Sequence, residues 1–202
     1  MGLRINSDIA GLQANRQLGQ TTRNLLRGLE QQTTLQRINR AADDAAGLAI
    51  SENFRSRIRQ LEAETGNLQS GVNYLQTADG GLQTQTEGLQ RVRELAVQAS
   101  NGTLTDDQRA ALNEEAQQIL QQIDETANTT EFNGANPLDG SQTTFDLGTE
   151  GGIEISVQES TVNSLGLSGL DISTAAGANS ALNQVDDALG QISQNRAVVG
   201  AQ

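Results

Sequence analysis

A seven-residue repeat of apolar side chains in the first half of the chain constrains the fold more than any other feature. One row recurs at every seventh position, and its members are Phe54, Leu61, Leu68, Leu75, Leu82, Leu89 and Ala96. A second row interleaves with it as Ile58, Thr65 and Val72, and then shifts by one position to Ala78, Gln85, Val92 and Ala99. Such a repeat predicts one long helix, over residues 44–99, with a narrow coiled-coil seam. We expect the five leucines of the first row to be buried within the chain as this seam.

Local signals place three further elements. Thr105 and Gln108 form a capping-box pattern, which predicts a second helix over residues 105–129. Apolar residues at spacings of three and four predict a last helix over residues 176–200. Between these helices, the stretch TTFDLGTEGGIEISVQ alternates apolar and polar residues around two glycines. This alternation predicts a β-hairpin near residues 143–158.

The N-terminal segment carries a stripe of apolar residues that has no evident partner within the chain. Its members are Ile5, Ile9, Leu12, Leu18, Leu25 and Leu29. A lone amphipathic helix of this length is marginal in water, so the segment is either disordered alone or covered by another chain. The sequence therefore predicts a mainly α fold, an elongated helical bundle or coiled-coil rod with one small β-hairpin. We expect two domains, residues 1–43 and residues 44–202.

The composition excludes several classes of function. The chain has no Cys and no His, and all 13 basic residues are Arg. Without His, Cys or Lys, most acyl-transfer and metal-hydrolase arrangements are unavailable, so we expect neither an enzyme nor a cofactor. The formal net charge of −12, with arginines spread among acidic residues, argues against nucleic-acid binding. The sequence contains no run of about 18 apolar residues, so we expect no transmembrane helix.

Two adjacent carboxylates, Asp43 and Asp44, are the strongest candidates for a chemical site. Neighbouring residues on a helix point about 100° apart, so the two side chains do not converge on one metal ion. No His, Cys or third clustered carboxylate supports ligation either. We therefore expect Asp43 to cap the long helix and Asp44 to meet the positive end of its dipole, with Arg37 and Arg40 close enough to pair with them.

Five stretches together resemble bacterial flagellins. They are RINRAADDAAGLAIS, LQTADGGL, LQRVRELAVQASNGT, NEEAQQILQQIDETANTTEFNGANPLDG and LGLSGLDIST, and they occur in this order over nearly the whole chain. The resemblance implies a structural subunit of the extracellular flagellar filament, which works as a helical homo-oligomer. It also implies export through the flagellar type III apparatus with chaperones, and assembly under a filament cap. The apolar N-terminal stripe would then pack between neighbouring subunits.

The sequence departs from the usual flagellin pattern at two places. Flagellins commonly carry Leu-Ser-Ser-Gly before Arg-Ile-Asn, where this chain has Gln-Thr-Thr-Leu at positions 32–35. Losing that glycine favours a continuous helix at this point. Flagellins also continue beyond NRAVVGAQ with a C-terminal core helix that pairs with the N-terminal one. That helix is absent here, and no large variable surface domain is inserted. We expect residues 1–202 alone not to form regular filaments.

The resemblance further implies a surface that an animal Toll-like receptor detects. The matching positions are Gln90, Arg91, Leu95 and Glu115. We expect Leu95 to be an exposed apolar contact without a role in the seam, and Glu115 to flank Arg91 because helices joined by a short turn run antiparallel. A hook–filament junction protein of the same family is the alternative function. An unrelated coiled-coil adaptor or an enzyme are further alternatives.

Overall fold

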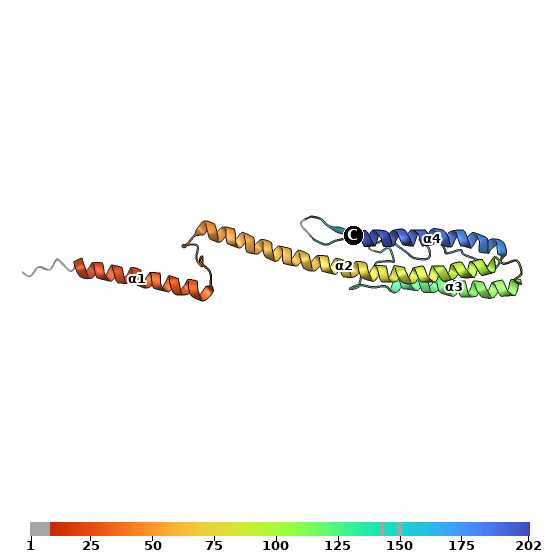
Figure 1. Ribbon diagram of the computed structural model, residues 1–202, viewed down its shortest axis with the longest axis horizontal. Coiled ribbons are helices and arrows are strands. Elements are labelled where there is room, and N and C mark those ends of the chain that lie inside the picture. Colours follow the sequence, from red (N-terminus) through yellow and green to blue (C-terminus); the bar gives the residue numbers. More distant parts are fainter. Residues whose placement is uncertain (1–8, 142–143, 149–150) are drawn as a thin grey trace, which may run out of the picture. The chain divides into compact units, whose positions relative to one another are not determined.

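The chain is mainly helical in a computed structural model that describes residues 9–141, 144–148 and 151–202 (Figure 1). The elements are α1 (Ile9–Thr34), α2 (Ala45–Ala99), α3 (Asp106–Thr129), β1 (Thr144–Asp146), β2 (Glu154–Ser156) and α4 (Ala175–Ala201). The helices expected over residues 44–99, 105–129 and 176–200 are confirmed to within one residue at each end. The hairpin is confirmed as two short antiparallel strands, with Phe145 opposite Ile155.

The residues form two compact units, Met1–Glu62 and Ala63–Gln202. The boundary lies inside α2, later than the boundary at residue 43 that the sequence suggests. The first unit contains α1, a connecting segment and the beginning of α2. The second unit contains the rest of α2 together with α3, the hairpin and α4.

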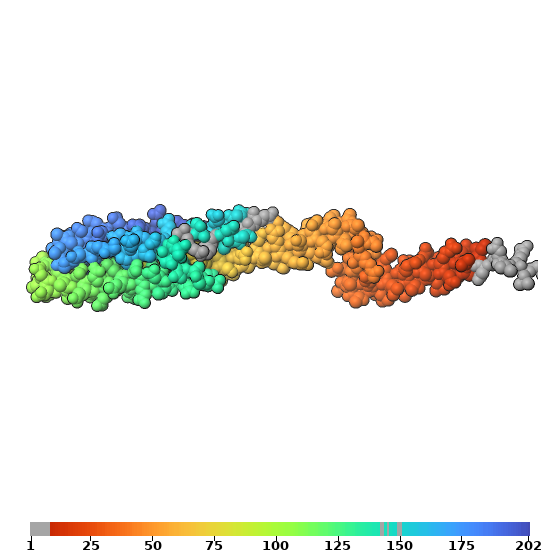
Figure 2. Space-filling model, turned by 180° about the vertical axis from the view of Figure 1, so that it is seen from behind, coloured from red at the N-terminus to blue at the C-terminus, as the bar shows by residue number. Residues whose placement is uncertain are grey.

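The second unit holds the hydrophobic core, where α3 and α4 both lie beside α2 (Figure 1). Arg93 and Arg196 pair with Asp186 and Asp79 respectively, so residue numbers rise along α2 as they fall along α4. These two helices are therefore antiparallel. The core is built from Leu82, Leu89, Val92, Leu120, Ile123, Val185 and Ile192, and is completed by Leu165, Leu167, Leu170 and Ile172. These last four come from the segment before α4, which lies between α3 and α4 (Figure 2).

The heptad seam is buried along only part of its length. Leu75 is 7% exposed and Leu82 and Leu89 are fully buried, as expected. Leu61 and Leu68 are 48% and 37% exposed, so the expectation that they are buried within the chain is wrong. The repeat determines which face of α2 is apolar, but the reach of the partner helices determines how much of that face is covered. Arg196, near the end of α4, pairs with Asp79, so little of α4 remains to cover the part of α2 before Asp79.

A buried amide links α2 to two other segments. Gln85 occupies a position of the second heptad row and is fully buried. Its Nε2 donates to the carbonyl of Ile123 in α3, at 3.2 Å, and to the carbonyl of Ser160, at 3.0 Å. A polar residue at a seam position fixes the register of packed helices, because any slip would leave the amide without these acceptors.

A buried arginine closes the junction between α2 and α3. Arg109 donates through Nε to the carbonyl of Ala99 (3.1 Å) and through Nη2 to that of Asn101 (3.2 Å). The carbonyl of Ala99 is the last one of α2, where the helix dipole favours a cation, and Asn101 lies in the turn that follows. The capping box at Thr105 is confirmed, because the hydroxyl of Thr105 accepts from the Gln108 amide N–H and the Gln108 side chain accepts from the Thr105 N–H.

In the first unit, α1 does not continue into α2. It ends at Thr34, and Leu35 has a φ of +54°. The expectation that losing glycine here favours a continuous helix is therefore wrong. By the resemblance drawn from the sequence, Leu35 stands where flagellins commonly carry glycine. It adopts the left-handed conformation that a glycine would adopt without steric cost.

Matched truncations along the seam measure its partial burial. Leu82→Ala should lower the free energy of unfolding of the monomer by about 2–5 kcal/mol, because it leaves a cavity in the core. Leu61→Ala, at an equivalent heptad position, should change it by less than about 1 kcal/mol, because Leu61 is half exposed. Urea unfolding followed by circular dichroism measures both. Equal losses for the two variants would contradict the partial seam.

Replacing Leu35, whose backbone is left-handed, by glycine should stabilise the C-terminal end of α1. Leu35→Gly removes a clash of about 1 kcal/mol, so amide hydrogen exchange in the last turn of α1 should slow by roughly fivefold. Thr34→Gly is the matched control, since it introduces glycine at a helical position and should make the same amides exchange faster. Exchange followed by NMR distinguishes the two. Faster exchange in Leu35→Gly would contradict the strain argument.

Candidate functional site

A charged triplet lies on the outer side of the α2–α3 pair. Nε and Nη2 of Arg91 both donate to Oε1 of Glu115, at 3.2 and 2.7 Å, and Nη1 donates to Oε2 of Glu94 at 3.0 Å. Arg91 and Glu94 belong to α2, whereas Glu115 belongs to α3. The antiparallel pairing of the two helices therefore brings Arg91 and Glu115 together, as expected from the sequence.

The triplet is exposed, and this limits what the ion pairs contribute to stability. Both side chains of the Arg91–Glu115 pair are about half exposed. The hydrogen bonds that Arg91 donates to Glu115 raise the pKa of Arg91 above its usual value, and the hydrogen bond that it donates to Glu94 adds to this effect. The guanidinium therefore stays charged at any physiological pH. Solvent screens such pairs, so the triplet is better suited to recognition than to holding the fold together.

A shallow hollow adjoins Arg91 between the two helices. It encloses about 220 Å³ and is lined by Thr84, Glu87, Gly88, Arg91, Ile119, Gln122, Ile123 and Thr126. A Cβ atom at Gly88 would lie 3.0 Å from Cγ1 of Ile123, so the glycine lets α2 and α3 approach closely here. Arg91 thus stands at the rim of a small concave surface.

The structure separates the other two residues of the expected receptor surface. Gln90 is exposed, but Leu95 is only 1% exposed and belongs to the core. The expectation that Leu95 is an exposed contact outside the seam is therefore wrong. Because α2 packs against both α3 and α4, its buried face is wider than the narrow seam of a two-stranded coiled coil. Leu95 lies within this wider face.

The adjacent aspartates have local structural roles that differ from those expected. Oδ1 of Asp44 accepts from the N–H of Gly47 at 2.8 Å, so Asp44 rather than Asp43 caps α2. A Cβ at Gly47 would lie 2.5 Å from Oδ2 of Asp44 and 2.8 Å from Cδ1 of Ile38, which explains the glycine at this position. Asp43 instead accepts from the N–H of Arg40 at 3.3 Å.

Ion pairs hold the connecting segment against α1. Asp43 lies 3.4 Å from Nε of Arg27, and Arg40 pairs with Glu30 at 2.9 Å. The expected pairing of Arg40 with the two aspartates through its side chain is therefore wrong, because its guanidinium is engaged by Glu30. Arg37 contributes its carbonyl, which accepts from Nε2 of Gln31 at 2.9 Å.

The apolar residues of α1 are exposed and occupy two faces. None of the 26 residues of this helix is buried. Leu18, Leu25 and Leu29 follow one another at spacings of seven and four residues, so they share one face, which we call the leucine face. Ile9 precedes Leu18 by nine residues, about two and a half turns, and therefore lies on the opposite side. Ile5 is outside the described residues.

The apolar residues near the N-terminal end of α1 lie on a different side of the helix from the leucine face. Leu12 precedes Leu18 by six residues, so it also lies off the leucine face. The broken stripe expected from the sequence therefore lies on two sides of α1. All described members of the stripe remain strongly exposed.

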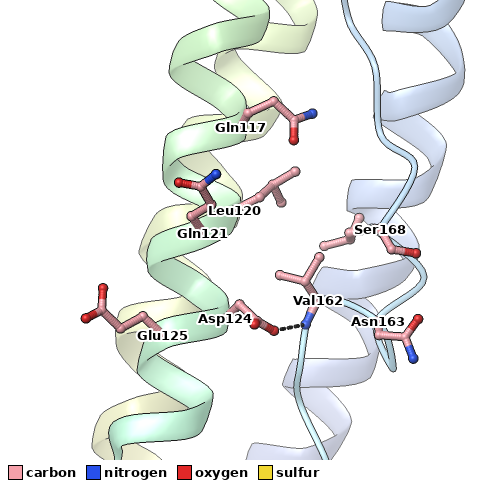
Figure 3. A pocket seen from close by; sticks show the side chains of 9 residues that line it. Gln117, Leu120, Gln121, Asp124, Glu125, Val162, Asn163 and Ser168 are labelled. Carbon is pink, nitrogen blue, oxygen red and sulfur yellow. Dashed lines mark hydrogen bonds between the residues drawn. The ribbon is translucent and has the colours of Figure 1, made fainter.

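A polar stripe on α3 binds the segment that precedes α4. Oδ1 of Asn113 accepts from the N–H of Ile172 at 3.0 Å, and Nε2 of Gln117 donates to the carbonyl of Leu170 at 2.6 Å. Oδ1 of Asp124 accepts from the N–H of Val162 at 3.2 Å (Figure 3). Residues 113, 117 and 124 share one side of α3 because they are four and seven residues apart.

A groove of about 460 Å³ lies between this stripe and the segment (Figure 3). In the close-up view, Asp124 points toward the backbone of Val162, while the side chain of Glu125 points away from it. The polar groups of Gln117 and Asp124 are used to hold backbone, and they do not converge on a common point. The groove therefore offers no acid–base pair for catalysis.

Two further observations concern the part of the chain that the structure describes. It contains no group of three or more acidic, His or Cys side chains that could hold a metal ion. None of its helices combines the length and the apolar character that crossing a membrane requires.

Sequence comparison finds one family across most of the chain. The family described as "Bacterial flagellin N-terminal helical region" matches residues 5–143. A flagellin of Halalkalibacterium halodurans is 38% identical over 98% of this chain and 75% of its own length. Flagellin FlaB1 of Treponema pallidum is 36% identical over 97% of this chain and 76% of its own length.

Solved structures agree with this assignment. The crystal structure of Bacillus cereus flagellin matches with a TM-score of 0.60 and 29% identity, covering 69% of this chain and 82% of that one. A putative flagellar hook-associated protein from Vibrio parahaemolyticus has a TM-score of 0.65 over 80% of this chain and 88% of its own. At 15% identity, this second likeness shows a shared fold alone. With the family match and the two relatives above 30% identity, the chain belongs to the bacterial flagellin family, a family of structural proteins.

Proposed function

We propose that this chain is a non-catalytic structural subunit of the flagellar filament, in which neighbouring copies cover the leucine face of α1. As a flagellin, the protein is part of the bacterial flagellar filament outside the cell. Relatives that match nearly the whole chain are named flagellins or flagellar filament core proteins, which favours the filament over the hook–filament junction. Export through the flagellar type III apparatus with chaperones, and growth under a filament cap, complete the proposal.

The exposed leucine face is the observation that carries the proposal. Leu18, Leu25 and Leu29 are 64%, 63% and 50% exposed in the isolated chain. Fully burying one such side chain is worth about 1.5–3 kcal/mol, so three of them favour association by several kcal/mol. An amphipathic helix without a covered face is marginal in water. Contacts between copies would therefore stabilise α1 as well as the assembly.

The beginning of α2 adds apolar surface to the first unit. Phe54, Ile58 and Leu61 are 64%, 54% and 48% exposed, and they follow one another at spacings of four and three residues. They form a single apolar row on α2. A monomer rarely leaves such rows uncovered, and larger exposed patches mark interaction sites. Both helices of the first unit thus offer faces that a neighbouring copy can cover.

Polar substitutions on the leucine face should block assembly without unfolding the second unit. With Leu25→Gln and Leu29→Gln combined, elongation of filament fragments should slow by at least about tenfold, because each loss exceeds about 1.4 kcal/mol. The assay uses recombinant protein with the same full chain that the source bacterium produces. This protein is added to sheared filaments from that bacterium, and elongation is followed by light scattering.

Val97→Gln is the matched control, because Val97 is 52% exposed but lies in the second unit. It should elongate filaments at the wild-type rate. Equal slowing by both changes would show that lost apolar surface acts non-specifically. A wild-type protein that does not join the fragments would overturn the proposed function.

A second proposed activity is detection of the monomer by an animal Toll-like receptor through the Arg91 surface. The observation that favours it is the exposed Arg91–Glu115 pair at the rim of the hollow between α2 and α3. Gln90 contributes a polar neighbour on the same surface. Leu95 would act only by packing beneath it, because its side chain is buried.

Removing the guanidinium tests this activity. Arg91→Ala should weaken binding to the receptor ectodomain by at least about tenfold, because an interface arginine commonly contributes about 2 kcal/mol. Arg93→Ala is the matched control, since it removes an exposed arginine that pairs with Asp186 instead. Surface plasmon resonance measures affinity, and circular dichroism verifies the helical content. Equal affinities of wild type and Arg91→Ala would disprove the assignment.

A further inference from the structure

The turn between α2 and α3 contains one of the two Asn-Gly steps of the chain, Asn101-Gly102. The other step is Asn133-Gly134, which follows α3. The side-chain amide of asparagine can be attacked by the backbone nitrogen of the next residue, most readily when that residue is glycine, because no side chain shields the nitrogen. Both asparagines are exposed. The two steps therefore share the same reactive groups, and only their surroundings differ.

Two donors converge on the side-chain oxygen of Asn101. Oδ1 accepts from the N–H of Thr103 at 3.0 Å and from the Thr103 hydroxyl at 2.9 Å. Both distances suit an oxyanion hole, in which donors stabilise the negative charge that develops on the oxygen of an attacked carbonyl. Among the residues that the structure describes, no acceptor binds the N–H of Gly102 or Nδ2 of Asn101. The attacking nitrogen and the leaving group of a cyclisation are therefore both available.

Asn133 lacks this arrangement. It has a φ of +51° and Gly134 has a φ of +81°, while the backbone groups of Phe132 and Ala135 bond each other at 2.9 and 3.0 Å. These values describe a tight two-residue turn that is closed by two hydrogen bonds. No donor within the described ranges binds the side-chain oxygen of Asn133. The chain thus contains an internal reference for the reactivity of Asn101.

We propose that Asn101 is a site of self-modification, at which asparagine is converted to isoaspartate. The nitrogen of Gly102 loses its proton to water and bonds to Cγ of Asn101, and the bond between Cγ and Nδ2 breaks as ammonia leaves. One water molecule then opens the resulting succinimide ring at the backbone carbonyl carbon of residue 101. The chain now runs through Cγ, and the former backbone carbonyl is a free carboxylate. The balance is asparagine and water giving isoaspartate and ammonia.

The buried guanidinium of Arg109 is placed to hold the new carboxylate. Its Nη2 donates to the backbone carbonyl oxygen of Asn101 at 3.2 Å, and Arg109 is only 7% exposed. This hydrogen bond polarises the carbonyl, which favours attack by water there over attack at Cγ. After ring opening the same oxygen belongs to a carboxylate, so the bond becomes an ion pair. We therefore expect mainly isoaspartate at position 101 and an α2–α3 junction that stays folded.

The modification needs only one copy of the chain. All of its groups lie in the turn between α2 and α3 or at the start of α3, so it is independent of the proposed assembly. Because ammonia leaves and water replaces it, the step is not reversed in dilute solution. The share of converted chains therefore rises with the age of the protein.

Peptide mapping of aged protein tests the site. The full chain is incubated in mildly alkaline buffer, folded or in urea, and mass spectrometry with electron-transfer fragmentation measures isoaspartate at both Asn-Gly steps. In the folded chain, Asn101 should convert at least about fivefold faster than Asn133, because donors to the developing oxyanion lower the barrier. In urea the two asparagines should convert at similar rates, because the turns that distinguish them are lost.

Removing one donor tests the role of Thr103. Thr103→Val removes the hydroxyl but keeps the backbone N–H and the shape of the side chain, so conversion of Asn101 should slow by at least about threefold. Thr129→Val is the matched control, since it removes an exposed hydroxyl that donates to the carbonyl of Glu125 instead. It should leave both conversion rates unchanged. Circular dichroism verifies that each variant is folded.

Several results would overturn the proposal. Equal rates at the two asparagines of the folded chain would do so, as would a Thr103→Val variant that converts at the wild-type rate. Faster conversion of Asn101 in urea as well would assign the reactivity to the local sequence rather than to the turn. A product that is mainly aspartate at position 101, or a converted chain that loses helical content, would refute the part assigned to Arg109.

Discussion

The fold depends on one helix that carries more apolar surface than its own chain covers. The 55 residues of α2 present a continuous seam, and α3, α4 and the segment before α4 bury it from Leu75 onward. The remaining apolar residues of the same helix, from Ile50 to Val72, stay exposed. Burial of apolar area stabilises a monomer only where partner helices reach. The same seam therefore provides a core at one end and an exposed apolar face at the other.

Polar groups determine how the covered part is arranged. Gln85 fixes the position of α2 against α3 and Ser160, and Arg109 joins the end of α2 to the start of α3. Asn113, Gln117 and Asp124 bind the backbone of the segment before α4, so that its leucines reach the core. A wrong register would leave the buried side chains of Gln85 and Arg109 without partners, which costs more than the bonds contribute. The core thus has one arrangement, although its apolar residues are mostly small or aliphatic.

The distribution of burial and charge agrees with a protein that is completed by assembly. The second unit is packed and strongly acidic, and the first unit has a helix without a single buried residue and a positive net charge. Apolar faces and complementary charges act over different ranges. Attraction between charges acts over about a Debye length, whereas burial of apolar faces acts only at contact, once water is excluded.

The sequence by itself determined the elements of this protein and its family. The heptad rows, the capping box at Thr105 and the alternating hairpin fixed the helix and strand positions, because these depend on neighbouring residues. The motifs around Asp43 and Arg91 identified a flagellin. The exposure of Leu61 and the burial of Leu95 were decided only by tertiary structure. The choice of Asp44 over Asp43 as the cap also involves it, because Asp43 is engaged by Arg27 of α1. Periodicity gives the direction of a side chain around its helix, but burial depends on which other segments lie there, and those segments come from distant parts of the sequence.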